Sequence, residues 1–205
     1  MRKMLEIGVL GSTRGSDLPA IVKGIEKGEL KNLARIAVVI SDKKDSGILE
    51  KARHYKLQNC YLDPKGMKRT SYDKKIAEML DEYNVRLVIL IGYMRLFSEW
   101  FVRRYKNRIM NIHPSLLPSF PGIDRNVHKA VLDYGCKVSG CTLFFVDEGK
   151  DTGPIIMQKA VPVYENDDVD TLKTRVQKAE QEIYPQAIRL FALGKLKIKR
   201  RKILS

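Results

Sequence analysis

The sequence predicts an α/β fold: an open, Rossmann-like, mostly parallel twisted sheet with helices on both faces and an antiparallel C-terminal addition. Short apolar runs alternate with amphipathic segments through the first 137 residues. Such alternation is typical of parallel strands joined by right-handed helical crossovers. After residue 137, two strand-like segments follow each other with only turn residues between them, which indicates an antiparallel pair.

The elements of the parallel part follow from uninterrupted apolar runs and from apolar residues at helical spacing. Residues 36–40 and 87–91 consist almost purely of Ile, Val and Leu, which is typical of strands buried on both faces. Residues 72–83 carry apolar side chains three and four positions apart, as on one face of a helix. We therefore expect strands at residues 4–10, 36–40, 60–62, 87–91 and 109–112, and helices from Leu18 onward, at residues 72–83 and at residues 99–105.

The C-terminal part begins with two strand-like segments, residues 138–146 and 155–163, joined by a stretch that contains two glycines and a proline. A long amphipathic helix follows, with acidic residues in its first turn, where they suit the positive end of the helix dipole. Pro185 has no backbone N–H, so we expect it to kink this helix or split it in two. The apolar face of the helix comprises Val169, Leu172, Val176, Ile183 and Leu190.

Composition predicts a single globular domain over residues 1–205. With 44% apolar and 30% charged residues, the chain is unlike an intrinsically disordered one. No apolar run reaches the length of about 18 residues that a membrane span needs. Residues 1–10 lack the pattern of a secretory signal, and three cysteines without zinc-ligand spacing (Cys60, Cys136 and Cys141) are typical of reduced thiols. We therefore expect a cytoplasmic protein without a membrane partner.

The net charge is strongly positive, because 38 Lys and Arg face 24 Asp and Glu, which gives +14. Six of the basic residues lie in residues 195–202, within a basic tail at 195–205. Such a tail could bind RNA or attract phosphorylated substrates, or it could be a solvated terminus. No aromatic residue interrupts the tail as a base-stacking platform requires. We therefore favour the solvated terminus and do not expect a nucleic-acid partner.

A glycine-containing loop, residues 11–17, separates the first strand from the first helix. Free backbone N–H groups and the positive end of the helix dipole converge at such a place and suit a phosphate group. Gly15, Ser16 and Asp17 would supply these donors, although the carboxylate of Asp17 would repel an anion. The alternative is a plain tight turn in which Ser16 or Asp17 caps the helix.

Asn111 and His113 lie at the end of a predicted parallel strand, where open α/β sheets bind their ligands. The two residues are two positions apart, so their side chains point to the same side of an extended strand. Pro114 and Pro118 stiffen the loop that follows. An amide donor beside an imidazole suits stabilising an oxyanion while a proton moves. We expect no metal here, because the three histidines of the chain are far apart in sequence.

Three motifs carry a resemblance to a known family. They are Gly-Tyr-Met-Arg-Leu at residues 92–96, Asn-Ile-His-Pro-Ser-Leu-Leu-Pro at 111–118 followed by Phe-Pro-Gly at 120–122, and Asp-Thr-Gly-Pro-Ile at 151–155. On these motifs the chain resembles the folate-dependent formyltransferases, and within them the branch that acts in purine biosynthesis. The similarity covers nearly the whole chain.

The resemblance implies transfer of the formyl group of 10-formyltetrahydrofolate to the amine of glycinamide ribonucleotide, by direct amine attack through a tetrahedral intermediate. It implies a catalytic set of Asn111, His113 and Asp151. Asn111 and protonated His113 would stabilise the developing oxyanion, and Asp151 would favour and orient the imidazolium by a charge-assisted hydrogen bond.

The resemblance also assigns the binding residues, with the nucleotide in about residues 1–100 and the folate and the catalytic groups in about residues 86–190. It places the substrate phosphate on the loop that ends at Asp17, and it implies small-molecule substrates for a monomer or a homodimer. Without the resemblance, composition alone would predict that the apolar residues assigned to folate binding are core residues instead. The nucleotide residues are Gly15, Ser16, Asp17, Arg69 and Glu180, and the folate residues are Met94, Arg95, Leu96, Phe97, Asp147 and Asp151.

Two positions depart from the pattern of the family: Asp17 stands where Asn is usual, and Asp124 stands where many members have His. Relatives with other acceptors remain as alternatives. A hydrolase that uses water usually carries an N-terminal regulatory domain, and an enzyme that formylates tRNA adds a C-terminal domain; we expect neither here. A sugar amine is a further acceptor, and a basic RNA-binding module is an alternative of another class, which would leave Asn111 and His113 unexplained.

Overall fold

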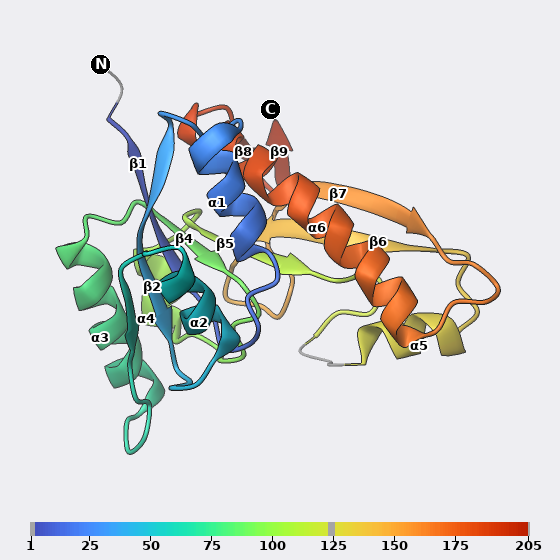
Figure 1. Cartoon of the computed structure of the whole chain (residues 1–205), viewed down its shortest axis with the longest axis horizontal. Coiled ribbons are helices and arrows are strands. Elements are labelled where there is room, and N and C mark those ends of the chain that lie inside the picture. Colours follow the sequence, from blue (N-terminus) through green and yellow to red (C-terminus); the bar gives the residue numbers. More distant parts are fainter. Residues whose placement is uncertain (1–2, 123–125, 205) are drawn as a thin grey trace.

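The computed structural model describes residues 3–122 and 126–204, and a seven-stranded sheet forms its centre (Figure 1). The strand order is β3-β2-β1-β4-β5-β6-β7. The first five strands are parallel, and β6 and β7 join them as antiparallel strands. The strands are β1 (Leu5–Leu10), β2 (Ala34–Ser41), β3 (Asn59–Tyr61), β4 (Leu87–Leu90), β5 (Ile109–His113), β6 (Val138–Phe145) and β7 (Ile155–Pro162). The predicted fold class is confirmed.

Helices cover both faces of the sheet because alternate residues of the buried strands point to opposite sides. Ile89 of β4 belongs to the buried cluster that includes residues of α1, α2, α5 and α6, whereas its neighbours Val88 and Leu90 belong to the cluster that includes residues of α3 and α4. Strands β1 and β4 are therefore buried on both faces, as the apolar run at residues 87–91 predicts for β4. The helices are α1 (Leu18–Lys27), α2 (Gly47–His54), α3 (Arg69–Glu82), α4 (Glu99–Arg104), α5 (Val127–Asp133) and α6 (Val169–Ala192). None of those in the described ranges is long and apolar enough to cross a membrane.

The strand order reverses between β1 and β4. From β1 the chain proceeds outward to β2 and β3, and it then returns to the other side of β1 to form β4 and β5. At such a switch point the loops that follow the two central strands diverge and leave a crevice at their carboxyl ends. The fold therefore directs the loops after β1, β4 and β5 to one edge of the sheet.

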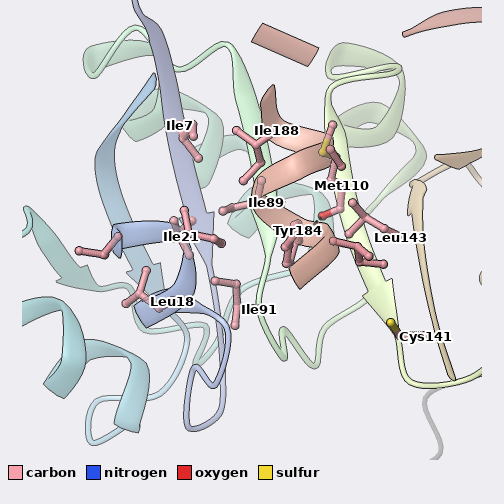
Figure 2. Packing of buried hydrophobic residues seen from close by; sticks show 14 of the residues in the cluster. Ile7, Leu18, Ile21, Ile89, Ile91, Met110, Cys141, Leu143, Tyr184 and Ile188 are labelled. Atoms are coloured by element: carbon pink, nitrogen blue, oxygen red, sulfur yellow. Dashed lines mark hydrogen bonds between the residues drawn. The ribbon is translucent and has the colours of Figure 1, made fainter. Parts of the chain in front are cut away.

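Helix α6 crosses this sheet beside α1 and fixes the positions of two central strands (Figures 1 and 2). The fully buried hydroxyl of Tyr184 lies 2.8 Å from the Leu90 carbonyl of β4 and 3.2 Å from the Met110 carbonyl of β5, so its proton is shared between them. Pro185 lies inside α6, which continues as one helix from Val169 to Ala192. Of the two outcomes expected at this proline, a kink or a split of the helix, the split is therefore wrong.

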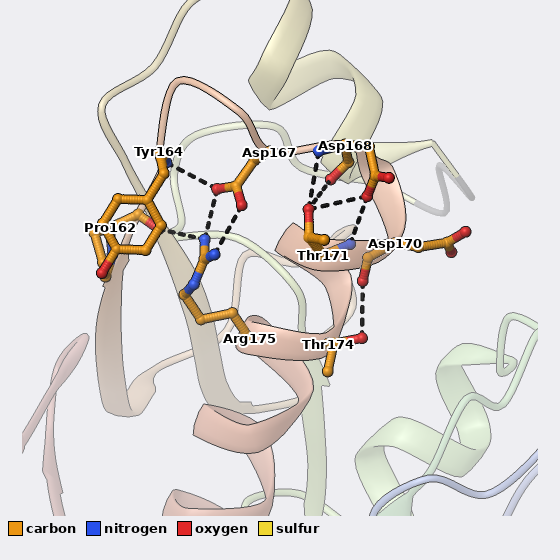
Figure 3. A network of polar contacts seen from close by, with 8 residues as sticks. All are labelled: Pro162, Tyr164, Asp167, Asp168, Asp170, Thr171, Thr174 and Arg175. Atoms are coloured by element: carbon orange, nitrogen blue, oxygen red, sulfur yellow. Dashed lines mark hydrogen bonds and ion pairs between the residues drawn. The ribbon is translucent and has the colours of Figure 1, made fainter.

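The first turn of α6 is fixed by side chains, as its acidic residues predict (Figure 3). Asp168 accepts a hydrogen bond from the Thr171 N–H at 2.8 Å, and Thr171 Oγ1 accepts one from the Asp168 N–H at 2.9 Å, which completes a capping box. Arg175 binds both carboxylate oxygens of Asp167, at 2.6 and 2.7 Å, and holds the pKa of that carboxyl well below its usual range.

Four elements were not expected from the sequence. Helices α2 and α5 have eight and seven residues, too short for a helical period to stand out. In the basic tail, Lys197–Lys199 (β8) and Lys202–Leu204 (β9) form an antiparallel hairpin. Ile198 and Ile203 of this hairpin pack against the core and alternate with exposed Lys side chains, so the tail is partly folded rather than wholly solvated.

The contact of Tyr184 with the two carbonyls predicts a measurable contribution to stability. We expect Tyr184→Phe to lower the free energy of unfolding by about 1–3 kcal/mol, because two buried acceptors lose their donor. Urea unfolding followed by circular dichroism measures this change. Tyr134→Phe is the control, because 82% of Tyr134 is exposed, and an equal change in both variants would contradict the role of the Tyr184 hydroxyl.

Candidate active site

The loops that follow β1 and β4 are joined by backbone and side-chain hydrogen bonds. The Ser12 N–H donates to the Gly92 carbonyl at 3.1 Å, and Ser12 Oγ accepts from the Met94 N–H at 2.9 Å. Gly92 has a φ of +60°, and a Cβ atom there would lie 2.1 Å from Thr13 Oγ1, so a larger residue would separate the loops. Met94, expected at the folate, is therefore held by its backbone to the first loop.

His113 ends β5 and is 4% exposed, with each ring nitrogen facing a protein group. Nε2 lies 2.7 Å from the Phe120 carbonyl, which can only accept, so Nε2 carries a proton and donates it. Nδ1 lies 3.5 Å from Asp151 Oδ2, beyond normal hydrogen-bond length. The structure thus brings together His113 and Asp151, which are 38 positions apart in the chain. In this conformation neither ring nitrogen has a free N–H for a ligand.

The two partners of the imidazole both have left-handed backbone conformations. Phe120 has a φ of +51° and Asp151 a φ of +54°. Non-glycine residues adopt this conformation at a cost of about 1–2 kcal/mol, and such residues are frequent where a site is preorganised. Asp151 is further fixed because its Oδ2 accepts the Gly122 N–H at 2.7 Å.

The proline-containing loop after β5 is held by polar residues of β6 and β7 that sequence reasoning missed. Thr142 Oγ1 donates to the Ser115 carbonyl at 2.7 Å and accepts the Leu117 N–H at 2.9 Å. Gln158 Nε2 donates to the Leu117 carbonyl at 2.9 Å. Thr142 is also the partner of His113 in the pairing of β5 with β6. The pairing of these two strands therefore positions both the imidazole of His113 and the loop that follows it. A threonine and a glutamine within strands gave no sign of this role in the sequence.

A cleft of about 210 Å³ opens between the loop after β4 and the loop that joins β6 to β7. Asn111 and Asp151 both line it, and Asn111 lies on the same side of β5 as His113. Of the residues expected at the folate, Arg95, Leu96, Phe97 and Asp147 line this cleft as well. Arg69, which was expected at the nucleotide, also lines it rather than the first loop.

Aromatic packing shapes the loop after β4. Phe97 stacks between Tyr93 and Phe101, with ring centroids 5.2 and 4.5 Å apart. The guanidinium of Arg95 lies 4.7 Å from the ring centroid of Tyr72. Phe97 therefore packs in an aromatic cluster, as composition alone predicts for a core residue, and it also lines the cleft.

The carboxylate of Asp147 organises the opposite wall of the cleft. Its Oδ1 accepts the Gly149 N–H at 3.1 Å and the Thr152 hydroxyl at 2.7 Å. The Asp147 side chain thus forms its hydrogen bonds within its own loop. Residues 147–151 of this loop line the cleft.

The first loop leads into α1 with Gly15 at a φ of +66°, where a Cβ atom would lie 2.7 Å from the Ile48 side chain. The Ser16 carbonyl accepts the Gln181 side-chain N–H of α6 at 2.9 Å. Asp17 occupies the N-cap position, but its side chain makes no capping hydrogen bond, so the interpretation of Asp17 as a helix cap is wrong for its carboxylate.

Asp17 and Glu180 are two buried carboxyls, 2% and 6% exposed, brought together from the first loop and from α6. Burial raises the pKa of Asp17 to about 7. Burial, followed by the charge of Asp17, raises the pKa of Glu180 well above its ordinary value. The first loop and α6, which carry four of the five residues predicted to bind the nucleotide, are thus in contact, and the charge of Asp17 acts on Glu180.

The described residues contain no group of three or more His, Cys, Asp and Glu side chains arranged to hold a metal ion. Asp124, one of the two departures from the family pattern, lies outside the described residues.

The candidate site consists of two regions along one edge of the sheet: the cleft at Asn111 and Asp151, and the first loop at Asp17.

Comparison with known proteins gives a match to the formyl transferase family over residues 5–188. The chain belongs to the formyl transferase family. Two bacterial relatives named phosphoribosylglycinamide formyltransferase, from Bacillus subtilis and Escherichia coli, are each 38% identical to this formyl transferase. The matches cover 91% and 95% of this chain and 94% and 90% of the relatives.

A solved structure agrees with this assignment. Glycinamide ribonucleotide transformylase 1 from Symbiobacterium toebii has a TM-score of 0.93 and 47% identity to this formyl transferase, with 98% of this chain and 93% of that chain covered. The trifunctional purine biosynthetic protein adenosine-3 from Bos taurus is 42% identical over 96% of this chain, which spans only 19% of the bovine protein. The family resemblance inferred from the three motifs is confirmed.

The left-handed conformation of Asp151 predicts different stabilities for two variants. We expect Asp151→Asn to retain nearly the full free energy of unfolding, because Asn tolerates this conformation and still offers an oxygen to the Gly122 N–H. Asp151→Ala should lose about 1–3 kcal/mol more than Asp151→Asn.

Urea unfolding measures both variants of Asp151. Asn107→Ala serves as the control for the backbone contribution alone, because Asn107 has a φ of +58°. Equal stabilities of the Asn and Ala variants at position 151 would contradict the proposed constraint.

Proposed function

We propose that this formyl transferase moves the formyl group of 10-formyltetrahydrofolate to the amine of glycinamide ribonucleotide in purine biosynthesis. The observation that carries the proposal is the approach of Asp151 to His113 beside a cleft that Asn111 also lines. The names of the bacterial relatives, which match over nearly their whole length, support the choice of substrate. The proposal includes a cytoplasmic location and small-molecule rather than nucleic-acid or membrane partners.

In the proposed reaction, the amine attacks the formyl carbon and a carbon–nitrogen bond forms while the carbonyl oxygen gains negative charge. The Asn111 amide would donate a hydrogen bond to this oxygen. The tetrahedral intermediate then releases tetrahydrofolate as the bond to its nitrogen breaks. The amine loses a proton and the folate nitrogen gains one, so the balance of the reaction requires one proton transfer.

His113 is the proposed group for this proton. Nε2 already carries a proton, which it donates to the Phe120 carbonyl in this structure. During the reaction, this N–H group would break its hydrogen bond to Phe120 and donate to the reacting atoms instead. Asp151, 3.5 Å from Nδ1, would then stabilise the imidazolium when both nitrogens are protonated. The left-handed backbone of Asp151 holds the carboxylate on the far side of the ring from Phe120.

The two regions of the site would receive the two substrates. The folate would occupy the cleft against Arg95, Leu96 and Phe97, with the backbone of the loop at Asp147 reading the pteridine edge. The phosphate of the ribonucleotide would lie at the free N–H groups of Gly15, Ser16 and Asp17 before α1. Glu180 would accept hydrogen bonds from the ribose hydroxyls, and Arg69 would reach the nucleotide from the cleft.

The role of His113 predicts a loss of turnover without a loss of binding. We expect His113→Ala to lower kcat by about 10²–10⁴-fold, the range for loss of a positioned proton-transfer group. The Kd for glycinamide ribonucleotide should change little. Steady-state kinetics and calorimetry measure the two quantities, with His54→Ala as the control because His54 is exposed. Similar kcat values for His113→Ala and the control would contradict the assignment.

The acceptor is tested by offering glycinamide ribonucleotide, water and methionyl-tRNA in parallel with 10-formyltetrahydrofolate. The expected result is rapid formylation of glycinamide ribonucleotide alone. Transfer only to methionyl-tRNA, or release of formate at the same rate with and without an amine, would overturn the proposed function.

A further inference from the structure

Two buried acidic side chains interact electrostatically where α1 begins. Asp17, 2% exposed, belongs to the first loop, and Glu180, 6% exposed, belongs to α6. The hydrogen bond from Gln181 to the Ser16 carbonyl joins the two elements directly beside the pair. Asp17 Oδ1 is buried and has no hydrogen-bond partner among the described residues. A buried polar atom without a partner is costly, so this atom calls for an explanation.

Among the residues that the structure describes, neither Asp17 nor Glu180 has an ion pair with a Lys, Arg or His side chain. The titratable groups that face the pair are Cys141 of β6 and Tyr184 of α6. Burial raises the pKa of the Cys141 thiol to about 12 and that of Tyr184 well above its ordinary value, so both stay neutral. The basic side chains nearest in sequence, Arg14, Lys23 and Lys178, are all exposed to solvent.

Two ionised carboxylates are unfavourable in such surroundings, because each loses hydration and each repels the other. The repulsion is reduced when the pair retains one proton, as in other pairs of carboxyls that share a site. A protonated Asp17 also changes from a pure acceptor into a hydrogen-bond donor. The side chain then offers one donor and one acceptor, as an amide does.

We infer that Asp17 and Glu180 share one proton and that this proton is required for the anionic ribonucleotide to bind at the first loop. The inference rests on the proposed function, which places a phosphate group at the N–H groups before α1. With the proton present, Asp17 donates to a phosphate oxygen. Without it, the pair carries two negative charges beside the phosphate and repels the substrate. Binding above neutral pH therefore takes up one proton.

The proton uptake is tested by comparing Kd values for glycinamide ribonucleotide between pH 6 and pH 9 in the wild type and in Asp17→Asn. The asparagine keeps the donor and cannot ionise. We expect the ratio of the wild-type Kd to the Asp17→Asn Kd to rise about tenfold per pH unit above about pH 7, as for one linked proton. Protons on the substrate itself affect both proteins alike and cancel in this ratio.

Glu26→Gln is the matched control, because Glu26 lies on α1 and is exposed. Its Kd should follow the wild type at every pH. Calorimetry in two buffers of different ionisation enthalpy should give about one proton more taken up by the wild type at pH 8 than by Asp17→Asn. A constant Kd ratio together with intact binding overturns the inference and leaves the proposed function standing. Absence of binding in every variant overturns both.

A measurement without substrate tests the shared proton separately. The folded pKa of Asp17 lies above its unfolded value, so the folded state binds the proton more tightly than the unfolded state does. The wild type should therefore lose stability relative to Asp17→Asn as the pH rises from about 4 to about 7, and the difference should level off above that range. Glu180→Gln should shift this loss to lower pH, since it removes the second charge. A stability difference that is independent of pH overturns the shared proton.

Discussion

The hydroxyl of Tyr184 connects the last long helix to the two strands that lead into the site. It reaches the carbonyls of Leu90, where β4 ends, and of Met110, the neighbour of Asn111. Glu180 lies one turn earlier on the same helix and therefore faces the first loop from the same side. The hydrogen bonds of the Tyr184 hydroxyl thus help to position α6 on the sheet. The position of α6 in turn places Glu180 near Asp17.

The imidazole of His113, beside the cleft, owes its orientation to two loops rather than to its own strand. β5 supplies the ring, but the Phe120 carbonyl and the Asp151 carboxylate fix its orientation from opposite sides. Thr142 and Gln158 hold the first of these loops. The antiparallel strands therefore do more than extend the sheet, because they carry the polar groups that support the site.

Much of the fold follows from local sequence. The apolar runs at residues 36–40 and 87–91 predict buried parallel strands, and the carboxyl end of β5 predicts where Asn111 and His113 lie. The period of a helix needs several turns to appear, which is why α2 and α5 were missed.

The site is less predictable than the strands because its contacts are long-range. Asp151 was linked to His113 only through family resemblance, since the 37 intervening residues leave their distance undetermined. The pairing of Asp17 with Glu180 depends on the packing of α6 over the first loop, which no local pattern encodes.

The strand order also has a consequence for how the chain matures on the ribosome. The first loop is among the earliest segments to be synthesised, whereas Glu180 and Tyr184 belong to the last long helix. Until that helix emerges and docks, Asp17 lacks its neighbour Glu180. The part of the candidate site at the first loop is therefore completed only near the end of translation, although its own backbone is made near the start.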